Sequence, residues 1–242
     1  MNTEKRPGGG ETIAAALMLG IALIVCAFVA KSALVTVKGF GRTISVTGAA
    51  SKPITSDFAL WEGKIQSSAA ALENAYAKIE KGLSETRAFM ANAGFGEKDY
   101  DIGAVQMNRY QDRETGAVTY YLVSTIKVQS SDIERIKSLS VNAASLIEKG
   151  VEFVSQTPRF ICTKTDEVKI EMIKAATENA QLRARELAES TGRKIGAPTS
   201  ARVGVFQIRP RNSQEVSDYG VNDVTSIEKE IVCTVQASFL IE

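Results

Sequence analysis

The hydrophobic positions of this chain fall into one uninterrupted apolar run near the N-terminus and a patterned remainder. Between Glu11 and Lys31 lie nineteen residues without a charged side chain. As a helix they would extend roughly 28 Å, close to the thickness of the hydrocarbon core of a bilayer. We therefore predict a short cytoplasmic leader over 1–11 and a transmembrane signal-anchor helix over 12–35.

A cleaved signal peptide is the alternative interpretation of this run. Its apolar region is normally about 7–15 residues long and precedes a small-x-small cleavage site, whereas this run is longer and its sites are weak. Basic residues flank the run on both sides, so they leave its orientation open. Because the leader is too short to be a domain, we expect a cytoplasmic N-terminus. The bulk of the chain would then be periplasmic, in a single-pass protein of the inner membrane.

Two small residues in the apolar run have a spacing that favours contact between membrane helices. Ala16 and Gly20 form a small-xxx-small pair. Such a pair lets two helix backbones approach closely. The alternative is that they are ordinary small residues of one helix.

After the apolar run, hydrophobic positions alternate between the periods of strands and helices. Alternation predicts strands over 43–48, 58–67, 101–113, 118–129, 151–163, 201–209 and 227–241. Spacings of three and four residues predict helices over 69–94, 131–150 and 165–192. The order is β-β-α-β-β-α-β-α-β-β. We therefore expect an α+β fold, with mixed or antiparallel sheets backed by helices and preceded by the transmembrane helix.

Local signals add detail to three of these elements. The turn-like segment Glu114-Thr115-Gly116 predicts a hairpin between the strands on either side of it. Ser131, followed by Glu134, predicts a capping box at the start of the 131–150 helix. The predicted buried stripe of the 69–94 helix is Leu72, Tyr76, Ile79, Leu83 and Met90.

The composition argues against most enzyme classes. The chain has no histidine, which removes the usual general base, the Ser-His-Asp and Cys-His pairs and the commonest zinc ligand. Its 29 basic and 28 acidic side chains form no basic block, and nucleotide-binding glycine motifs are absent. We therefore predict no catalytic, cofactor-binding or metal-binding residues, no nucleic-acid partner, and a protein that is not an enzyme.

Two carboxylate pairs keep a histidine-independent enzyme open as an alternative. Asp99 and Asp101 alternate onto one face of a predicted strand, and Glu167 and Glu171 are one helical turn apart. Paired carboxylates can act as acid and base when their pKa values are split. Solvated surface charge is the simpler explanation of both pairs.

Two cysteines lie in the predicted strands of the patterned region. Cys162 and Cys233 would bridge in an oxidising compartment if the fold brings them together. Two buried free thiols are the alternative, because their separation in the sequence says nothing about geometry.

A long polar segment over 210–225 is a candidate binding loop. At sixteen residues it is longer than most hairpin connections, and such loops are often functional or disordered. Arg209 and Arg211 flank its proline and would suit a carboxylate or phosphate, and Tyr219 lies near its centre. A ligand- or partner-binding module is therefore a second alternative function, and an exposed disordered tip is the simpler explanation.

Four segments resemble the SIMPL-domain family of exported bacterial proteins. They are ISVTGAASKPITSDFA (44–59), DIGAVQMNRY (101–110), YYLVSTIKVQ (120–129) and ATENAQLRARELAESTGRKIG (176–196). The last, an alanine-rich helix ending in paired glycines, carries the most weight. Together with the element order, the resemblance covers about residues 43–242, although Ile54 stands where the family commonly has an acidic residue.

The resemblance implies a periplasmic or cell-surface domain over 43–242, self-association, and a link to envelope or oxidative stress. It supplies no catalytic residues. We therefore expect a membrane-anchored homo-oligomer, for which a closed ring is one arrangement. The lipid bilayer is an expected partner, and the protein partner is unidentified. Aromatic side chains are enriched at interfaces, so Trp61, Tyr110, Tyr120 and Tyr121 are candidate oligomer contacts. Core or edge-strand packing is the alternative for each of them.

Overall fold

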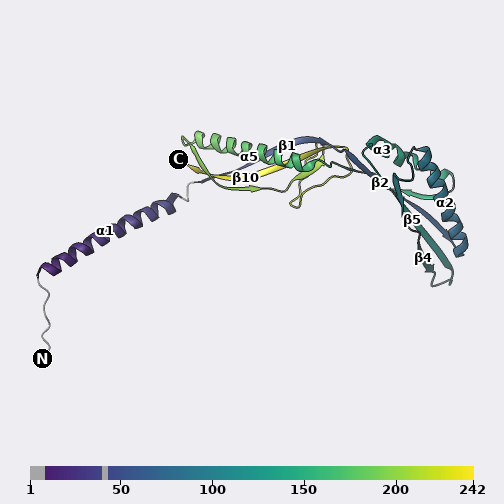
Figure 1. The fold of residues 1–242 in the computed structure, drawn as a ribbon, viewed down its shortest axis with the longest axis horizontal. Coiled ribbons are helices and arrows are strands. Elements are labelled where there is room, and N and C mark those ends of the chain that lie inside the picture. Colours follow the sequence, from purple (N-terminus) through teal and green to yellow (C-terminus); the bar gives the residue numbers. More distant parts are fainter. Residues whose placement is uncertain (1–8, 40–42) are drawn as a thin grey trace, which may run out of the picture. The chain divides into compact units, whose positions relative to one another are not determined.

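The computed structural model describes the backbone of residues 9–39 and 43–242 (Figure 1). In its N-terminal helix, side chains are described at 13 and 17–31. The chain forms two compact units. One comprises the chain up to Gly48 with Thr177–Arg202 and Val235–Glu242, and the other comprises Ala49–Ala176 and Val203–Thr234. We refer to them as unit 1 and unit 2.

The helices are α1 (Gly9–Gly39), α2 (Leu72–Asn92), α3 (Ile133–Asn142), α4 (Ser145–Glu148) and α5 (Thr165–Ser190). The strands are β1 (Thr43–Thr55), β2 (Phe58–Ala69), β3 (Tyr100–Ile102), β4 (Gln106–Gln111), β5 (Val118–Ser130), β6 (Glu152–Ser155), β7 (Arg159–Ile161), β8 (Ile195–Val203), β9 (Gln207–Pro210) and β10 (Glu228–Ile241). The order agrees with the predicted α+β class.

Helix α1 contains the apolar run identified in the sequence. Within the part of the chain that the structure describes, no helix is both long enough and apolar enough to cross a membrane. The predicted membrane-spanning helix over 12–35 therefore has no support from the structure and stays a prediction of the sequence. Residues 1–8 of the predicted leader lie outside the described residues.

Unit 2 contains a six-stranded sheet with the order β3-β5-β2-β6, in which β4 also pairs with β5 and β7 with β2. All of these pairs are antiparallel. The alternation predicted for β5 is confirmed, because Leu122, Ser124, Ile126 and Val128 are buried. Helices α2 and α3 pack on this face of β2 and β5 (Figure 1). One face of the sheet thus forms the core of unit 2.

The buried stripe of α2 differs from the prediction at its N-terminal end. Ile79, Leu83 and Met90 are buried as expected, but Leu72 and Tyr76 are 42% and 52% exposed. These two side chains line a groove that is open to solvent. The first turn of α2 therefore extends beyond the buried core. The spacing of hydrophobic residues along a helix does not show how far the sheet covers that helix.

The start of α3 corrects the predicted capping box. The N-cap is Asp132 and not Ser131, and the Asp132 carboxylate accepts a hydrogen bond from the backbone N–H of Arg135 at 3.1 Å. The Asp132 N–H itself donates to the Ser130 hydroxyl at 3.0 Å. Both residue types cap helices well, so the choice depends on where β5 releases the chain.

Several predicted elements are divided or displaced in the structure. The 101–113 strand is β3 and β4, the 131–150 helix is α3 and α4, and the 151–163 strand is β6 and β7. In the first case the break occurs where the Ser124 hydroxyl donates to the Gly103 carbonyl at 2.7 Å. Strand β8 begins at Ile195 rather than at 201, and β1 continues past Pro53. Both are edge strands, where a proline is tolerated.

Unit 1 has a core built on small side chains. Ala180 and Ala184 of α5 pack with Val46 of β1 and with Ala237 and Phe239 of β10. Alanines at this spacing let the helix backbone lie close to the strands. The alanine-rich helix noted in the sequence is α5, and toward its C-terminal end Ala188 is buried whereas Leu187 is exposed.

Candidate functional site

A cavity of about 630 Å³ lies in unit 2, between β7, the first turns of α5 and the loops 204–206 and 219–224. Lys229 of β10 reaches into its wall, and Cys162 and Tyr219 also line it. The structure therefore brings one of the two predicted cysteines and part of the predicted binding loop to the same cavity.

Lys229 is a charged residue in the interior of unit 2. Only 2% of it is exposed, and its Nζ donates to the carbonyls of Phe160 and Asp223, each at 2.6 Å. Burial lowers the pKa of this ammonium, and the charges of Asp223 and Cys162 partly oppose that shift. The side chain thus fastens β10 to β7 and to the loop. Sequence reasoning missed it, because its two hydrogen-bond acceptors come from other segments of the chain.

The predicted binding loop is held in a defined conformation by the side chain of Gln207. Its Oε1 accepts from the N–H groups of Ser217 and Val221 at 3.3 and 2.7 Å. Its Nε2 donates to the Ser217 carbonyl at 2.7 Å. A further backbone hydrogen bond joins Ile208 N–H to the Val221 carbonyl at 2.7 Å. These hydrogen bonds connect β9 to residues 217 and 221 of the loop.

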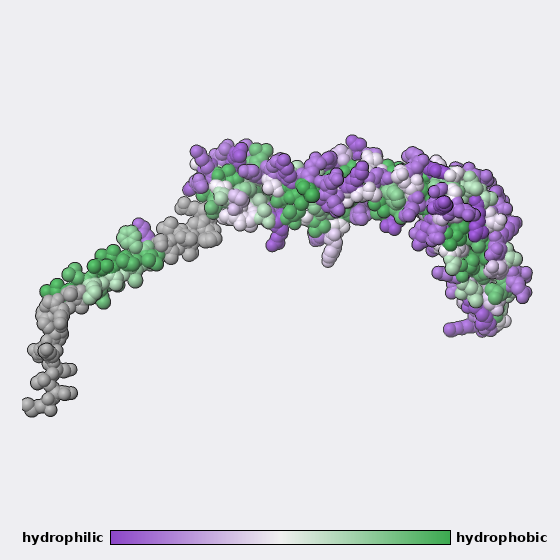
Figure 2. Space-filling model, viewed as in Figure 1, coloured by the Kyte–Doolittle hydropathy of each residue, from purple (hydrophilic) through white to green (hydrophobic). Residues whose placement is uncertain are grey.

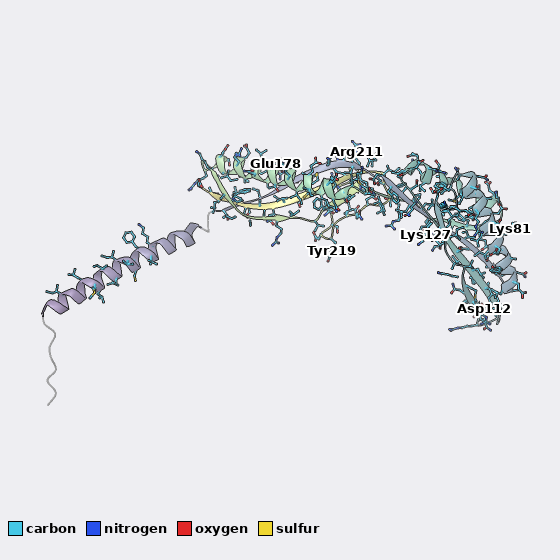
Figure 3. The ribbon with its side chains drawn as sticks, viewed as in Figure 1. Lys81, Asp112, Lys127, Glu178, Arg211 and Tyr219 are labelled. Carbon is cyan, nitrogen blue, oxygen red and sulfur yellow. The ribbon has the colours of Figure 1, made fainter. Side chains whose placement is uncertain are left out.

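The three predicted residues of this loop have different surroundings. Arg209 donates to the Glu230 carboxylate at 3.2 Å and to the Glu215 carbonyl at 3.3 Å. Its guanidinium therefore already has protein acceptors. Arg211 is exposed, and Tyr219, which is 97% exposed, projects from the loop (Figure 3). The structure does not join the two arginines into one anion-binding pair.

Cys162 and Cys233 are both free thiols in the structure. Cys162 is half-buried beside the cavity, and Cys233 is buried in β10. Burial raises the pKa of the Cys233 thiol, which disfavours its reactive thiolate. The structure therefore agrees with the free-thiol alternative, except that only Cys233 of the two is fully buried.

The four candidate contact aromatics divide between core and surface. Trp61 is 1% exposed, its indole N–H donates to the Ser155 hydroxyl at 3.0 Å, and its ring lies 5.9 Å from that of Phe153. Tyr120 packs partly buried against the same core. Tyr110 and Tyr121 are exposed on β4 and β5. Of the four, only Tyr110 and Tyr121 have exposed side chains.

The two carboxylate pairs also differ. Asp99 and Asp101 line one cavity of about 480 Å³ together with Lys98 and Lys127. Asp99 accepts from the Gly96 N–H at 2.7 Å. The structure therefore brings this pair together at a surface that already supplies basic neighbours.

The second carboxylate pair lies on α5. The Glu171 carboxylate forms an ion pair with Lys52 at 2.6 Å, so one member of this pair has a cationic partner. That ion pair is what the surface-charge explanation of Glu167 and Glu171 expects.

The remaining predicted contact lies in α1. Gly20 has no protein atom near the position that a Cβ would occupy, so its surface is open, and the side chain of Ala16 lies outside the described residues. Over the described residues, no three side chains of the metal-binding types gather into a site.

A family model described as "SIMPL: Protein of unknown function (DUF541)" matches residues 44–239. No curated protein matches the chain. Among solved structures, a chain titled "De novo designed protein Foldit4" is 15% identical, with a TM-score of 0.22. That match covers 41% of this chain and 93% of the designed one.

Proposed function

The chain belongs to the SIMPL family, and from this premise we propose that it is a membrane-anchored, periplasm-facing protein that assembles into a homo-oligomer. Its role would be structural or binding, in the cell envelope or its stress response. The observation that carries the proposal is the exposed apolar surface of α1. The stress role rests on the family resemblance alone.

The exposed surface of α1 supports the anchor. Its described large hydrophobic side chains, from Ile13 to Val29, are 55% to 69% exposed. On the face that Figure 2 shows, they gather into an apolar patch on the described part of the helix. A helix that is apolar on all sides needs an apolar environment on all sides, which lipid supplies. In the sequence, the nineteen-residue uncharged run would extend roughly 28 Å as a helix, close to the thickness of the hydrocarbon core of a bilayer.

The hairpin of β4 and β5 supports self-association. Met107 is exposed on the helix-facing side of this hairpin, beside the exposed Leu72 and Tyr76 of α2, and Tyr110 and Tyr121 are exposed on its opposite side. Exposed apolar and aromatic groups gathered in this way are typical of protein–protein contact surfaces. A tether that confines the copies to one membrane plane raises their effective concentration, so modest contacts suffice for assembly.

Membrane fractionation tests the anchor. We expect the full chain to stay in the membrane pellet after an alkaline carbonate wash. Ile21→Lys with Val25→Lys should release it, because each lysine near the centre of a spanning helix costs about 3 kcal/mol. The matched control is Val141→Lys with Ile170→Lys, at two exposed hydrophobic positions outside α1. Release of the wild type by carbonate would refute the anchor.

Light scattering on the detergent-solubilised full chain tests assembly. We expect a protein mass that is a multiple of the 26.0 kDa chain. A monomer at every concentration would refute the homo-oligomer.

Maleimide labelling of a Ser213→Cys variant in intact cells tests the orientation, since a periplasmic loop should react with an impermeant reagent. Labelling only after lysis would place the domain on the other side.

A further inference from the structure

We propose that strand β4 is the assembly interface, and that it pairs antiparallel with β4 of a second copy across a two-fold axis at Asn108. This inference rests on the proposed self-association and specifies the surface that makes it. Strand β4 lies entirely in unit 2.

Strand β4 forms an open edge of the six-stranded sheet. Both β3 and β4 pair with β5, at 126–128 and 118–123, while β2 occupies the other side of β5. All six residues of β4 are exposed. The outer side of β4 therefore presents unpaired backbone N–H and C=O groups, with no partner among the described residues, and such an edge is a template for pairing with another strand.

The other sheet edges of the described chain carry prolines, which hinder this kind of pairing. Pro53 lies in edge strand β1 and Pro198 in edge strand β8. Pro158 lies between β6 and β7, which pair with β2 at the far edge of the six-stranded sheet. Among the edges that the described residues form, only the one made by β3 and β4 has no proline within or between its strands. Proteins protect edges with proline, so the unprotected one is the candidate for a partner.

Symmetry limits how β4 can pair with its own copy. A two-fold axis perpendicular to the sheet leaves each sheet face on the same side in both copies. Because opposite residues of an antiparallel pair have side chains on the same face, one residue of β4 must then lie directly opposite its own copy, with the axis between the two. Centring it on Arg109 would set two guanidinium groups directly opposite each other, which is destabilising. Centring it on Asn108 sets two neutral amides opposite each other instead. The second register is therefore the favoured one.

The Asn108 register also gives the side chains complementary neighbours. It places Met107 opposite Arg109 of the second copy. Met107 lies on the helix-facing side, because it pairs with the buried Leu122. There it lines an apolar groove with Tyr76 and the acidic Glu73. Arg109 of the second copy would lay its apolar stem over this groove and bring its charge toward Glu73. Shape and charge both favour a second copy as the occupant.

A charge exchange at position 108 tests the interface and its register. Asn108→Lys and Asn108→Asp should each weaken self-association about tenfold or more, because each sets like charges directly opposite across the axis. Mixing the two variants should restore association, since lysine then faces aspartate. The measurement is sedimentation velocity of the full chain in detergent. The matched controls are Ser200→Lys and Ser200→Asp, in the exposed edge strand β8, which should associate as the wild type does.

A cysteine at the same position checks the register directly. Opposite residues of an antiparallel pair have Cα atoms about 4.5–5.5 Å apart, within reach of a disulfide. Asn108→Cys should therefore give a disulfide dimer on oxidation, and Ser200→Cys should not. If the wild type associates but the 108 variants behave like it and their mixture shows no recovery, the β4 interface is wrong. If the wild type never associates, the proposed assembly fails as well.

Discussion

Lys229 is a charged residue at a position where the alternation of β10 calls for an apolar one. Its neighbours in phase, Ile231 and Cys233, are buried as expected. The lysine is accommodated because two backbone carbonyls accept its hydrogen bonds. Burying this ammonium is still costly, which is why its pKa is lowered.

This lowered pKa predicts an alkaline rise in stability. Between the pKa in the folded state and the ordinary value of 10.5, the unfolded chain binds a proton that the folded chain lacks. The free energy of unfolding should therefore increase as the pH rises through that window. Urea unfolding of the wild type and Lys229→Met at several pH values up to 10.5 measures it. The variant should lack this component, and identical profiles would contradict the assignment.

Gly63 is a position where the absence of a side chain matters. A Cβ at this residue of β2 would collide with the Phe153 ring, which itself packs on Trp61. We expect Gly63→Ala to destabilise the protein by about 1–3 kcal/mol through overpacking, measured by urea unfolding. Gly103→Ala is the control, because its Cβ would make only ordinary contact with the Thr125 carbonyl. Equal stability of the two variants would argue against this packing.

At the scale of elements, the start of α3 separates two candidate caps. Asp132→Ala should cost about 1 kcal/mol of stability, because the Arg135 N–H loses its acceptor. Ser131→Ala should change little, since Ser131 is exposed and is not the N-cap. Thermal unfolding of both variants measures the difference. A larger loss for Ser131→Ala would restore the capping box that the sequence predicts.

The 210–225 loop depends on one side chain from β9. Gln207→Ala removes three hydrogen bonds to the loop, at about 1 kcal/mol each, so we expect a loss of about 2–3 kcal/mol. Limited proteolysis should then cut near Ser217 in the variant sooner than in the wild type. Gln207→Glu keeps the acceptor for two N–H groups and should show an intermediate effect. Unchanged proteolysis of Gln207→Ala would mean that other contacts order the loop.

At the scale of the whole molecule, the Asp57 carboxylate joins two segments that are distant in the sequence, whereas the Asp223 carboxylate closes a local turn. Asp57 accepts from the Thr163 N–H and hydroxyl, each at 2.7 Å, and Asp223 accepts from Thr225. Burial alone would raise their pKa values, but these hydrogen bonds outweigh it and lower them. Both carboxylates lie in unit 2.

These carboxylates predict how stability falls in acid. Because each folded-state pKa lies below its ordinary value of 3.8, the stabilisation is complete above that pH. It is lost as the pH falls through the lowered pKa, where the folded chain must take up the protons. Unfolding experiments between about pH 5 and about pH 2 bracket the ordinary carboxyl pKa. Over this range, the free energy of unfolding of the double variant Asp57→Asn with Asp223→Asn should fall less steeply than that of the wild type. A slope equal to that of the wild type would contradict the assignment.

The periodic features of the fold were predictable from the sequence because each depends on neighbours along the chain. The alternation of β5, the alanine face of α5 and the turn at Gly116 follow from local spacing and backbone conformation. The positive φ of Gly116 fits that turn. The family was also predictable, since the order of short segments carries it.

The site residues were less predictable, because their roles depend on contacts between distant segments. Trp61 was a candidate contact, but the sheet and its helices enclose it. Nothing local marks Lys229 or Gln207 as clamps, since their acceptors and donors come from other elements. Arg209 resembled a free anion ligand until the fold supplied Glu230 as its partner.

The sequence by itself determined the element types, the family and the apolar N-terminal run, because these are properties of composition and period. Only the tertiary structure decided which strand edge is left unprotected, which aromatic side chains reach the surface, and which polar groups are already paired. Those outcomes depend on which segments become neighbours in space. The open edge at Asn108 is one of them, because it depends on which strands pair with β5.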